Sequence, residues 1–187
     1  MLAEETIAEL GGIDILVNNA GLLPSPESSW WNTTPADWAK VYNQNVVSIV
    51  RLVQRLGPRM REAGWGRVIN ISSGGAWQPF ANMADYTATK AALLNLTVSL
   101  AKEFAGKGVT VSAVSPGIIV TESTERYFRK VAQDQGWPEE WSEIEKRVLA
   151  NFLPNSSGRL GRPADIANVV LFLPHRCRTT SMARTIA

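Results

Sequence analysis

A doubly wound α/β fold with a parallel sheet is predicted from two features of the sequence. Short β-branched runs at Ile13–Val17, Val68–Ile71 and Val109–Val114 alternate with longer segments of helical character. Each run leads into polar or glycine-containing sequence, as buried parallel strands do where they reach the carboxyl edge of a sheet. Strands separated by helices require crossover connections, which are right-handed and make neighbouring strands parallel.

Three helices are expected between and before these strands. The first spans Leu2–Leu10 and ends at the glycine pair that follows it. The second begins at Thr34-Pro35-Ala36-Asp37, which supplies a capping hydroxyl, a proline in the first turn and an acidic residue, and extends to about Ala63. The third contains Tyr86 and spans about Ala84–Ala105. These segments place the polar residues at the strand ends near one another.

The bulk composition is that of one ordinary globular domain. The chain has 187 residues, 45% of them hydrophobic, and a net charge of +2 from well-mixed charges. No basic stripe suggests a nucleic-acid partner, and no apolar run is long enough to span a membrane. The single cysteine, Cys177, fits a reducing compartment and hence a cytoplasmic location, and with His175 it makes a poor metal pair, so no metal site is expected.

Tyr86, Lys90 and Ser73 are candidates for proton-transfer chemistry. Tyr86 and Lys90 are four residues apart on the expected helix, so their side chains share a face. A unit charge ~4 Å from a phenol in partly shielded surroundings is worth about 4 kcal/mol, or roughly three pKa units. Such a shift would make a phenol a usable general acid or base near neutral pH. Ser73, at the end of a strand, could hydrogen-bond the oxygen that Tyr86 protonates.

The chain resembles the short-chain dehydrogenase/reductase family over most of Ile13–Leu173. Asn18–Gly21 resembles the Asn-Asn-Ala-Gly motif of the family, and Asn45 matches its helix asparagine. Ser73, Tyr86 and Lys90 complete the catalytic tetrad of the family. The segments Ser115–Thr121 and Gly158–Ala167 resemble later motifs of the family, in the expected order. The resemblance implies an NAD(P)-dependent oxidoreductase with a Rossmann-like fold.

The resemblance also implies roles for individual residues. In the catalytic tetrad, Asn45 holds a water that links the lysine to solvent, Ser73 polarises the carbonyl, Tyr86 transfers the proton, and Lys90 lowers the tyrosine pKa and binds the ribose. The implied cofactor-binding residues are Asn19, Ala20, Gly21, Tyr86, Lys90, Pro116, Gly117, Ile119 and Thr121. The implied substrate is a small alcohol or ketone, and the implied assembly is a homodimer or homotetramer formed through the two long helices.

Substrate selectivity is expected to come from a lid. Residues 122–157 are polar and aromatic and follow the segment that the family places beside the nicotinamide. Aromatic residues there and Trp77, near Ser73, suggest a pocket for an apolar or ring-bearing substrate. The competing interpretation is that these aromatic residues only pack against one another.

Both ends of the chain depart from the family. No glycine-rich phosphate-binding turn follows an early strand, so the choice between NAD and NADP cannot be read. The fold is therefore expected to be incomplete, with about three strands of the usual seven, and Ile13–Val17 becomes an edge strand. We interpret residues 1–173 as a partial domain and residues 174–187 as an aberrant tail, and we hypothesise a frameshift there. The codons of Met182 and Ala183 read out of frame give the glycine that the family has.

Two other functional classes stay open. One is a catalytically idle, truncated remnant or binding module that inherited the tetrad, which the missing phosphate-binding turn favours. The other is a serine hydrolase using Ser72 or Ser73, which would require a histidine base, and the sequence offers only His175.

Overall fold

A computed structural model describes residues 2–23, 29–152, 157–175 and 183–186. These residues form two compact units. The first unit comprises Met1–Ser115 and Val170–Ala187, and the second comprises Pro116–Val169. The predicted lid, residues 122–157, falls within the second unit.

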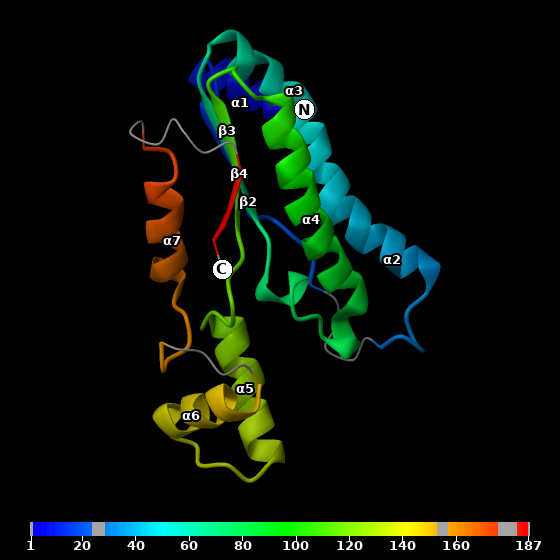
Figure 1. The fold of residues 1–187 in the computed structure, drawn as a ribbon. Helices are drawn as coiled ribbons and strands as arrows, with labels where there is room; N and C mark the ends of the chain where they lie inside the picture. The colour runs from blue at the N-terminus through cyan, green and yellow to red at the C-terminus, as the bar shows by residue number, and fades with distance from the viewer. Residues whose placement is uncertain (1, 24–28, 153–156, 176–182, 187) are drawn as a thin grey trace. The chain divides into compact units, whose positions relative to one another are not determined.

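The first unit contains a parallel sheet, seen nearly edge-on in Figure 1. Its strands are β1 (Ile15–Asn18), β2 (Gly66–Ile71), β3 (Val109–Val114) and β4 (Ala183–Ile186), in that spatial order. All three strands predicted from the sequence are present and pair in parallel. The further strand, β4, pairs with β3 in a segment where the sequence predicted none. The segment forms a strand because its backbone pairs with β3, and pairing with a formed sheet outweighs a weak local propensity for strand structure.

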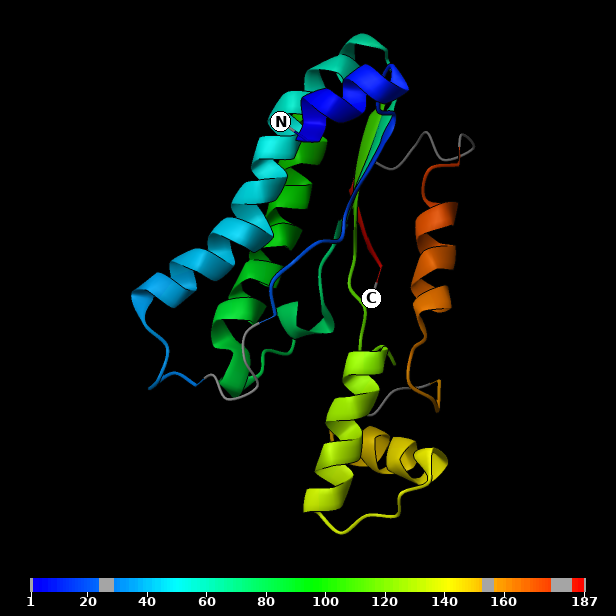
Figure 2. The same ribbon diagram turned by 180° about the vertical axis from the view of Figure 1, so that it is seen from behind.

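Helices α1 (Leu2–Leu10), α3 (Ser48–Glu62) and α4 (Ala84–Glu103) also belong to this unit. Figures 1 and 2 show α3 and α4 side by side on one face of the sheet. Residues of both helices pack with strand residues into one hydrophobic core, comprising Val46, Ile49, Val53, Met60, Val68, Leu93, Ala101, Phe104, Val109 and Val111. This core fixes α4 over the strands, and each fully buried aliphatic side chain contributes about 1.5–3 kcal/mol.

The second predicted helix is divided by a π-helical turn. It begins at α2 (Pro35–Tyr42), where Thr34 and Asp37 form the expected capping box. The turn η1 (Asn43–Val47) follows, and α3 continues from it. A π turn inserts an extra residue into the helical ladder and often occurs at functional sites. Here it contains Asn45, which is buried.

The β1 strand forms one edge of the described sheet, as expected. Its side chains alternate: Leu16 packs against the core, whereas Ile15 is 42% exposed and Val17 is 40% exposed. The edge strand therefore leaves part of an apolar surface uncovered.

The second unit has its own small core. Helices α5 (Glu122–Asp134) and α6 (Trp141–Asn151) contact one another, and α7 (Pro163–Phe172) begins in this unit. Phe128, Ala132, Ile144, Val148 and Leu160 are buried together, with Trp137 and Trp141 packed against them.

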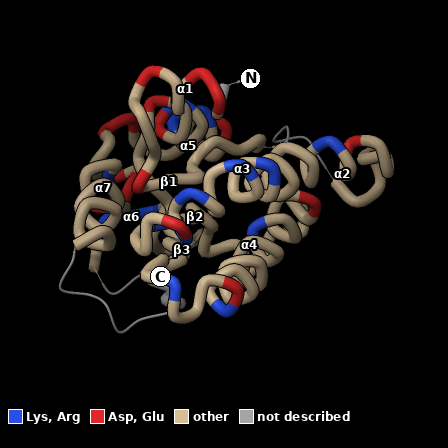
Figure 3. Tube along the Cα trace, turned by 90° about the horizontal axis from the view of Figure 1, so that it is seen from above, with Lys and Arg blue, Asp and Glu red and all other residues tan. Residues whose placement is uncertain are grey.

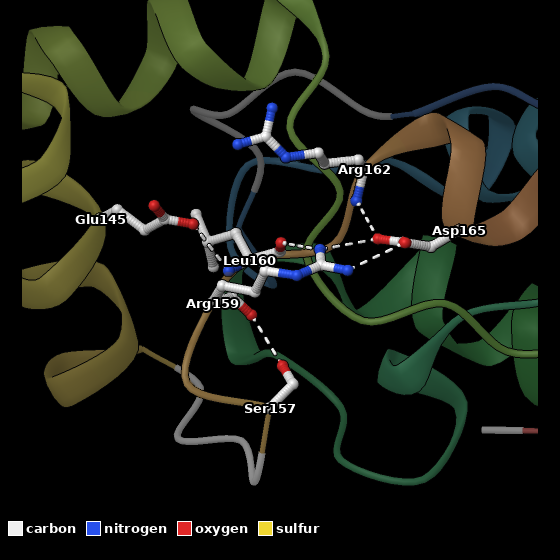
Figure 4. Close-up of polar contacts among 6 residues, drawn as sticks. All are labelled: Glu145, Ser157, Arg159, Leu160, Arg162 and Asp165. Carbon is white, nitrogen blue, oxygen red and sulfur yellow. Dashed lines mark hydrogen bonds and ion pairs between the residues drawn. The ribbon is translucent and has the colours of Figure 1, made fainter.

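The segment before α7 is held by polar contacts, shown in Figure 4. Arg159 donates two hydrogen bonds to Asp165, whose carboxylate also accepts from the Arg162 backbone at the start of α7. The guanidinium of Arg159 lowers the pKa of Asp165 to about 2. On the other side, the Leu160 amide donates to Glu145 of α6. These contacts tie α6 to α7.

Candidate active site

The carboxyl end of β2 places two serines beside α4. Ser72 donates a hydrogen bond from its hydroxyl to the Lys90 carbonyl oxygen, at 2.7 Å. Ser73 is extended and caps the short 3₁₀ helix η2 (Gly74–Ala76), where its Oγ accepts from the Gly75 amide at 3.1 Å. The two serines therefore point in different directions: Ser72 fastens the helix, and Ser73 is half-buried at the strand end.

Helix α4 presents Tyr86 and Lys90 on one face, as their spacing predicts. The Lys90 Nζ lies 5.5 Å from the centre of the Tyr86 ring. It donates a hydrogen bond to the Ile71 carbonyl oxygen at 2.9 Å, and Lys90 as a whole is buried. The strand end of β2 thus anchors the ammonium beside the phenol.

Burial sets the proton affinities of this pair. Burial raises the pKa of the Tyr86 hydroxyl above its ordinary value, and a hydrogen bond with Ser73 opposes that rise. Burial lowers the pKa of Lys90 to about 8, because a charged ammonium loses hydration there. In this structure desolvation outweighs the lowering of the tyrosine pKa that was expected from the lysine charge. Lys90 can therefore exchange a proton at mildly alkaline pH.

Asn45 connects the site to the loop after β1. Its side chain is 1% exposed. Its Oδ1 accepts from the Leu22 amide at 2.6 Å, and its Nδ2 donates to the Leu22 carbonyl at 3.0 Å and to Thr89 Oγ1 at 3.1 Å. The amide of Asn45 thus holds both polar groups of one backbone residue, much as a neighbouring strand would.

The loop at Asn19–Gly21 lies close to these groups. Asn19, Ala20 and Gly21 are exposed after the carboxyl end of β1. A Cβ built on Gly21 would lie 3.3 Å from Asn45 Oδ1 and 3.7 Å from Lys90 Nζ. Glycine therefore lets the loop pack closely against Asn45 and Lys90, where a side chain would be crowded. The exposed loop and the nearby ammonium are chemically compatible with a dinucleotide.

The remaining predicted cofactor residues belong to the second unit. Pro116, Gly117, Ile119 and Thr121 precede α5, and Thr121 caps that helix by accepting from the Thr124 amide at 3.3 Å. Ile119 pairs with Gly161 in an isolated parallel bridge.

The first unit, by contrast, brings together Asn45, Ser73, Tyr86, Lys90 and the Asn19–Gly21 loop.

The aromatic residues divide between packing and exposure. Phe128, Trp137 and Trp141 pack within the second unit, as the packing interpretation expects. Tyr127 and Phe152 flank Phe128 in edge-on contacts and are each partly exposed. Trp77, four residues after Ser73, is 61% exposed. The packing interpretation therefore holds for Phe128, Trp137 and Trp141, whereas Trp77 is exposed in the first unit and Tyr127 and Phe152 are exposed in the second.

Sequence reasoning missed two residues of the site. Thr89 accepts from Asn45 and donates to the Tyr86 carbonyl, and Leu22 supplies the backbone groups that Asn45 binds. The sequence does show a threonine directly before Lys90, in a helix otherwise rich in small and apolar residues, and this could have marked Thr89 as part of the site. Its partner, 44 positions away, could not be read from the sequence.

The described residues also bear on metal binding and membrane insertion. Within those residues no three His, Cys, Asp or Glu side chains gather to hold a metal ion, and Cys177 lies outside them. His175 is exposed. No helix in the described ranges combines the length and apolar character needed to cross a bilayer. Acidic and basic positions are dispersed over the elements, as Figure 3 shows.

Known proteins similar to this chain include several reductases. The sequence model of the short chain dehydrogenase family matches residues 1–132. Acetoacetyl-CoA reductase of Rhizobium meliloti is 36% identical over 166 residues, covering 89% of this chain and 62% of the relative. A 3-oxoacyl-(acyl-carrier-protein) reductase of Staphylococcus aureus is 32% identical over 174 residues, covering 92% of this chain and 63% of the relative. The chain thus spans less than two thirds of these relatives.

A solved structure covers the whole chain. L-sorbose reductase from Gluconobacter frateurii, in complex with NADPH and L-sorbose, superposes with a TM-score of 0.88 at 28% identity. It matches 100% of this chain, which covers 69% of that protein. Xylitol dehydrogenase bound to NAD⁺, at 23% identity and a TM-score of 0.81, shares the fold.

Proposed function

Because the chain belongs to the short-chain dehydrogenase family, we propose that it carries the catalytic centre of an NAD(P)-dependent oxidoreductase. The proposed reaction interconverts a carbonyl group and a secondary alcohol. The observation that carries this proposal is the placement of Ser73, Tyr86 and Lys90 around one strand end, with the lysine held by the Ile71 carbonyl. The bound nicotinamide supplies hydride in one direction and accepts it in the other.

Tyr86, Ser73 and Lys90 would control the transfer of a proton to and from the substrate oxygen. In reduction, the Tyr86 hydroxyl would donate its proton to the substrate oxygen and become a phenolate. In oxidation, that phenolate would accept the proton of the alcohol and return to the hydroxyl. The raised pKa of Tyr86 suits the donor role, because the phenol keeps its proton at neutral pH. Ser73 hydrogen-bonds the same substrate oxygen. The Lys90 charge favours the phenolate that forms, and its pKa of about 8 allows it to take part in returning the proton.

We assign the cofactor to two segments. Asn19, Ala20 and Gly21 would line the adenosine end, with Lys90 on the ribose. Pro116, Gly117, Ile119 and Thr121 would line the nicotinamide end. Support comes from the close approach of Gly21 to Lys90 and from the NADPH present in L-sorbose reductase. Either NAD or NADP is compatible with the residues present.

We propose an apolar alcohol or ketone as substrate, with residues 122–157 as its lid. The exposure of Tyr127 and Phe152, both within those residues, supports this choice. A cytoplasmic location and a homodimeric or homotetrameric assembly stay predictions from the sequence, as do the domain bounds and the frameshift hypothesis. We do not favour the idle-remnant alternative, because the catalytic side chains keep a mutually supporting geometry.

Replacing Tyr86 with phenylalanine tests the proposed reaction. Tyr86→Phe keeps the ring and removes the proton donor, so turnover should fall about 10²–10⁴-fold while cofactor binding persists. Tyr42→Phe, at an exposed tyrosine on α2, is the matched control and should leave turnover unchanged. Turnover would be followed with a panel of ketones and both cofactors, and binding by tryptophan fluorescence.

Two outcomes would refute the proposal. One is wild-type protein that binds neither NADH nor NADPH. The other is a Tyr86→Phe variant that turns over like the Tyr42→Phe control.

A further inference from the structure

Two threonines on the buried side of α4 make the same pair of hydrogen bonds. Thr89 Oγ1 donates to the Tyr86 carbonyl at 2.7 Å and accepts from Asn45 Nδ2 at 3.1 Å. Thr97 Oγ1 donates to the Leu93 carbonyl at 2.7 Å and accepts from Asn70 Nδ2 at 2.9 Å. Both threonines are 1% exposed. Each therefore uses its one proton inside the helix and accepts an amide from another segment.

The two bridges lead to different places. From Thr97 the chain of hydrogen bonds continues through Asn70 to Asn18, the last residue of β1, so it ends in the sheet just before the loop. From Thr89 it continues through Asn45 to both polar groups of Leu22, which directly follows the Asn19–Gly21 loop. The other end of the Thr89 bridge is the backbone of Tyr86 itself. Thr89 thus stands between the loop and the proton donor.

Thr89 adds a third contact to the orientation of Asn45 that the two Leu22 hydrogen bonds set. Its oxygen is taken by the Leu22 amide, and its nitrogen donates to the Leu22 carbonyl and to Thr89. With all three contacts made, the amide has one orientation that satisfies every buried group. If the Thr89 oxygen is removed, one amide hydrogen of Asn45 has no acceptor, and the orientation that serves Leu22 is less strongly fixed.

We propose that Thr89 is a positioning residue that holds the Asn19–Gly21 loop in register with Tyr86 and Lys90, acting through Asn45. The proposal rests on the proposed function for what this register serves. Gly21 shows why the register of the loop matters, since a Cβ at this position would lie within 4 Å of both Asn45 Oδ1 and Lys90 Nζ. A small shift of the loop would change how a dinucleotide meets Lys90.

The test compares Thr89→Val, Thr97→Val and Thr89→Ser. Valine keeps the shape of threonine without its hydroxyl, so each valine variant breaks one equivalent bridge. Thr97→Val is the matched control for general loosening of α4, and Thr89→Ser restores the oxygen. The first measurement is amide hydrogen exchange at Leu22, which reports on the hydrogen bonds between Asn45 and the Leu22 backbone and does not require turnover. The second is cofactor affinity and the pH dependence of kcat and of kcat/KM.

In Thr89→Val, the Leu22 amide should exchange about tenfold faster, cofactor affinity should fall, and kcat/KM should drop roughly tenfold to a hundredfold with an altered pH profile. Thr97→Val and Thr89→Ser should keep the wild-type exchange at Leu22 and the wild-type pH profile. Equal Leu22 exchange in the two valine variants would overturn the inference. So would Thr89→Ser exchanging as fast as Thr89→Val, or faster exchange with no change in cofactor affinity.

Failure of the proposed function would look different. Wild-type protein would then bind neither cofactor, and no variant would turn over a ketone. Leu22 exchange would still decide in that case whether Thr89 fixes the loop.

Discussion

Asn45→Asp replaces a buried donor with an acceptor and changes almost nothing else. The side chain keeps its shape, but the atom facing the Leu22 carbonyl and Thr89 Oγ1 becomes an oxygen. Thr89 cannot compensate by donating, since its proton already serves the Tyr86 carbonyl. Two favourable contacts are lost, and a carboxylate is placed where the side chain is 1% exposed.

The expected cost follows from these contacts. Each buried polar group left without a partner costs ~1–3 kcal/mol, and a buried uncompensated charge costs roughly 3–5 kcal/mol. The ammonium of Lys90, across Gly21, offsets part of this, so we expect a loss of about 3 kcal/mol in the free energy of unfolding. That is a large fraction of the ~5–15 kcal/mol that stabilises a typical domain.

The destabilisation caused by Asn45→Asp should depend on pH. Burial raises the pKa of a carboxyl group, so the folded variant prefers the protonated acid. A protonated carboxyl can donate to the Leu22 carbonyl again. The destabilisation should therefore be greatest at neutral pH and shrink as the pH falls toward the carboxyl range.

Asn43→Asp is the matched control on the same π turn. Asn43 is exposed, and its Oδ1 accepts from Arg51 at 2.9 Å, a contact that a carboxylate would keep. Its stability should change by no more than about 0.5 kcal/mol. Urea unfolding followed by tryptophan fluorescence, at neutral and mildly acidic pH, measures both variants. If Asn45→Asp unfolds like Asn43→Asp at neutral pH, Asn45 does not make the contacts described.

Two further predictions concern a turn and the buried lysine. Gly106 and Gly108 both have positive φ, of 72° and 71°, but only at Gly108 would a Cβ overlap a backbone atom, the Gly64 carbonyl oxygen. Gly106→Ala should cost ~1 kcal/mol and Gly108→Ala more than about 3 kcal/mol in urea unfolding, and equal costs would contradict this contact. The pKa of Lys90, about 8 against 10.5 for the free group, means that the unfolded chain binds more protons between these values. Wild-type stability should therefore rise with pH across this window, and Lys90→Met should not show that rise; parallel curves would contradict the burial of the ammonium.

The sequence predicted those parts of the fold that depend on local pattern. Alternating β-branched runs located three of the strands, and the capping residues Thr34 and Asp37 located the start of α2. The four-residue spacing of Tyr86 and Lys90 correctly placed them on one helical face. β4 was missed because its sequence carries little strand signal and its pairing with β3 depends on the rest of the sheet.

The pKa values of Tyr86 and Lys90 depend on how deeply the two side chains are buried. The sequence suggested that a lysine charge would lower the Tyr86 pKa, whereas in the structure burial raises it. Burial is a property of the packed core around β2 and α4, so spacing along a helix cannot supply it. The same burial brings the Lys90 pKa down to about 8.

The sequence by itself determined which groups can move a proton here: a phenol, an ammonium and a hydroxyl at positions that a helix and a strand end bring together. Only the tertiary structure decided how these groups are oriented and how strongly each holds its proton. Asn45 reaches Leu22 across 23 positions and Thr89 across 44, and such contacts exist only once the core has closed. The physical reason is that hydrogen-bond geometry and desolvation belong to neighbours in space, which local sequence patterns do not encode.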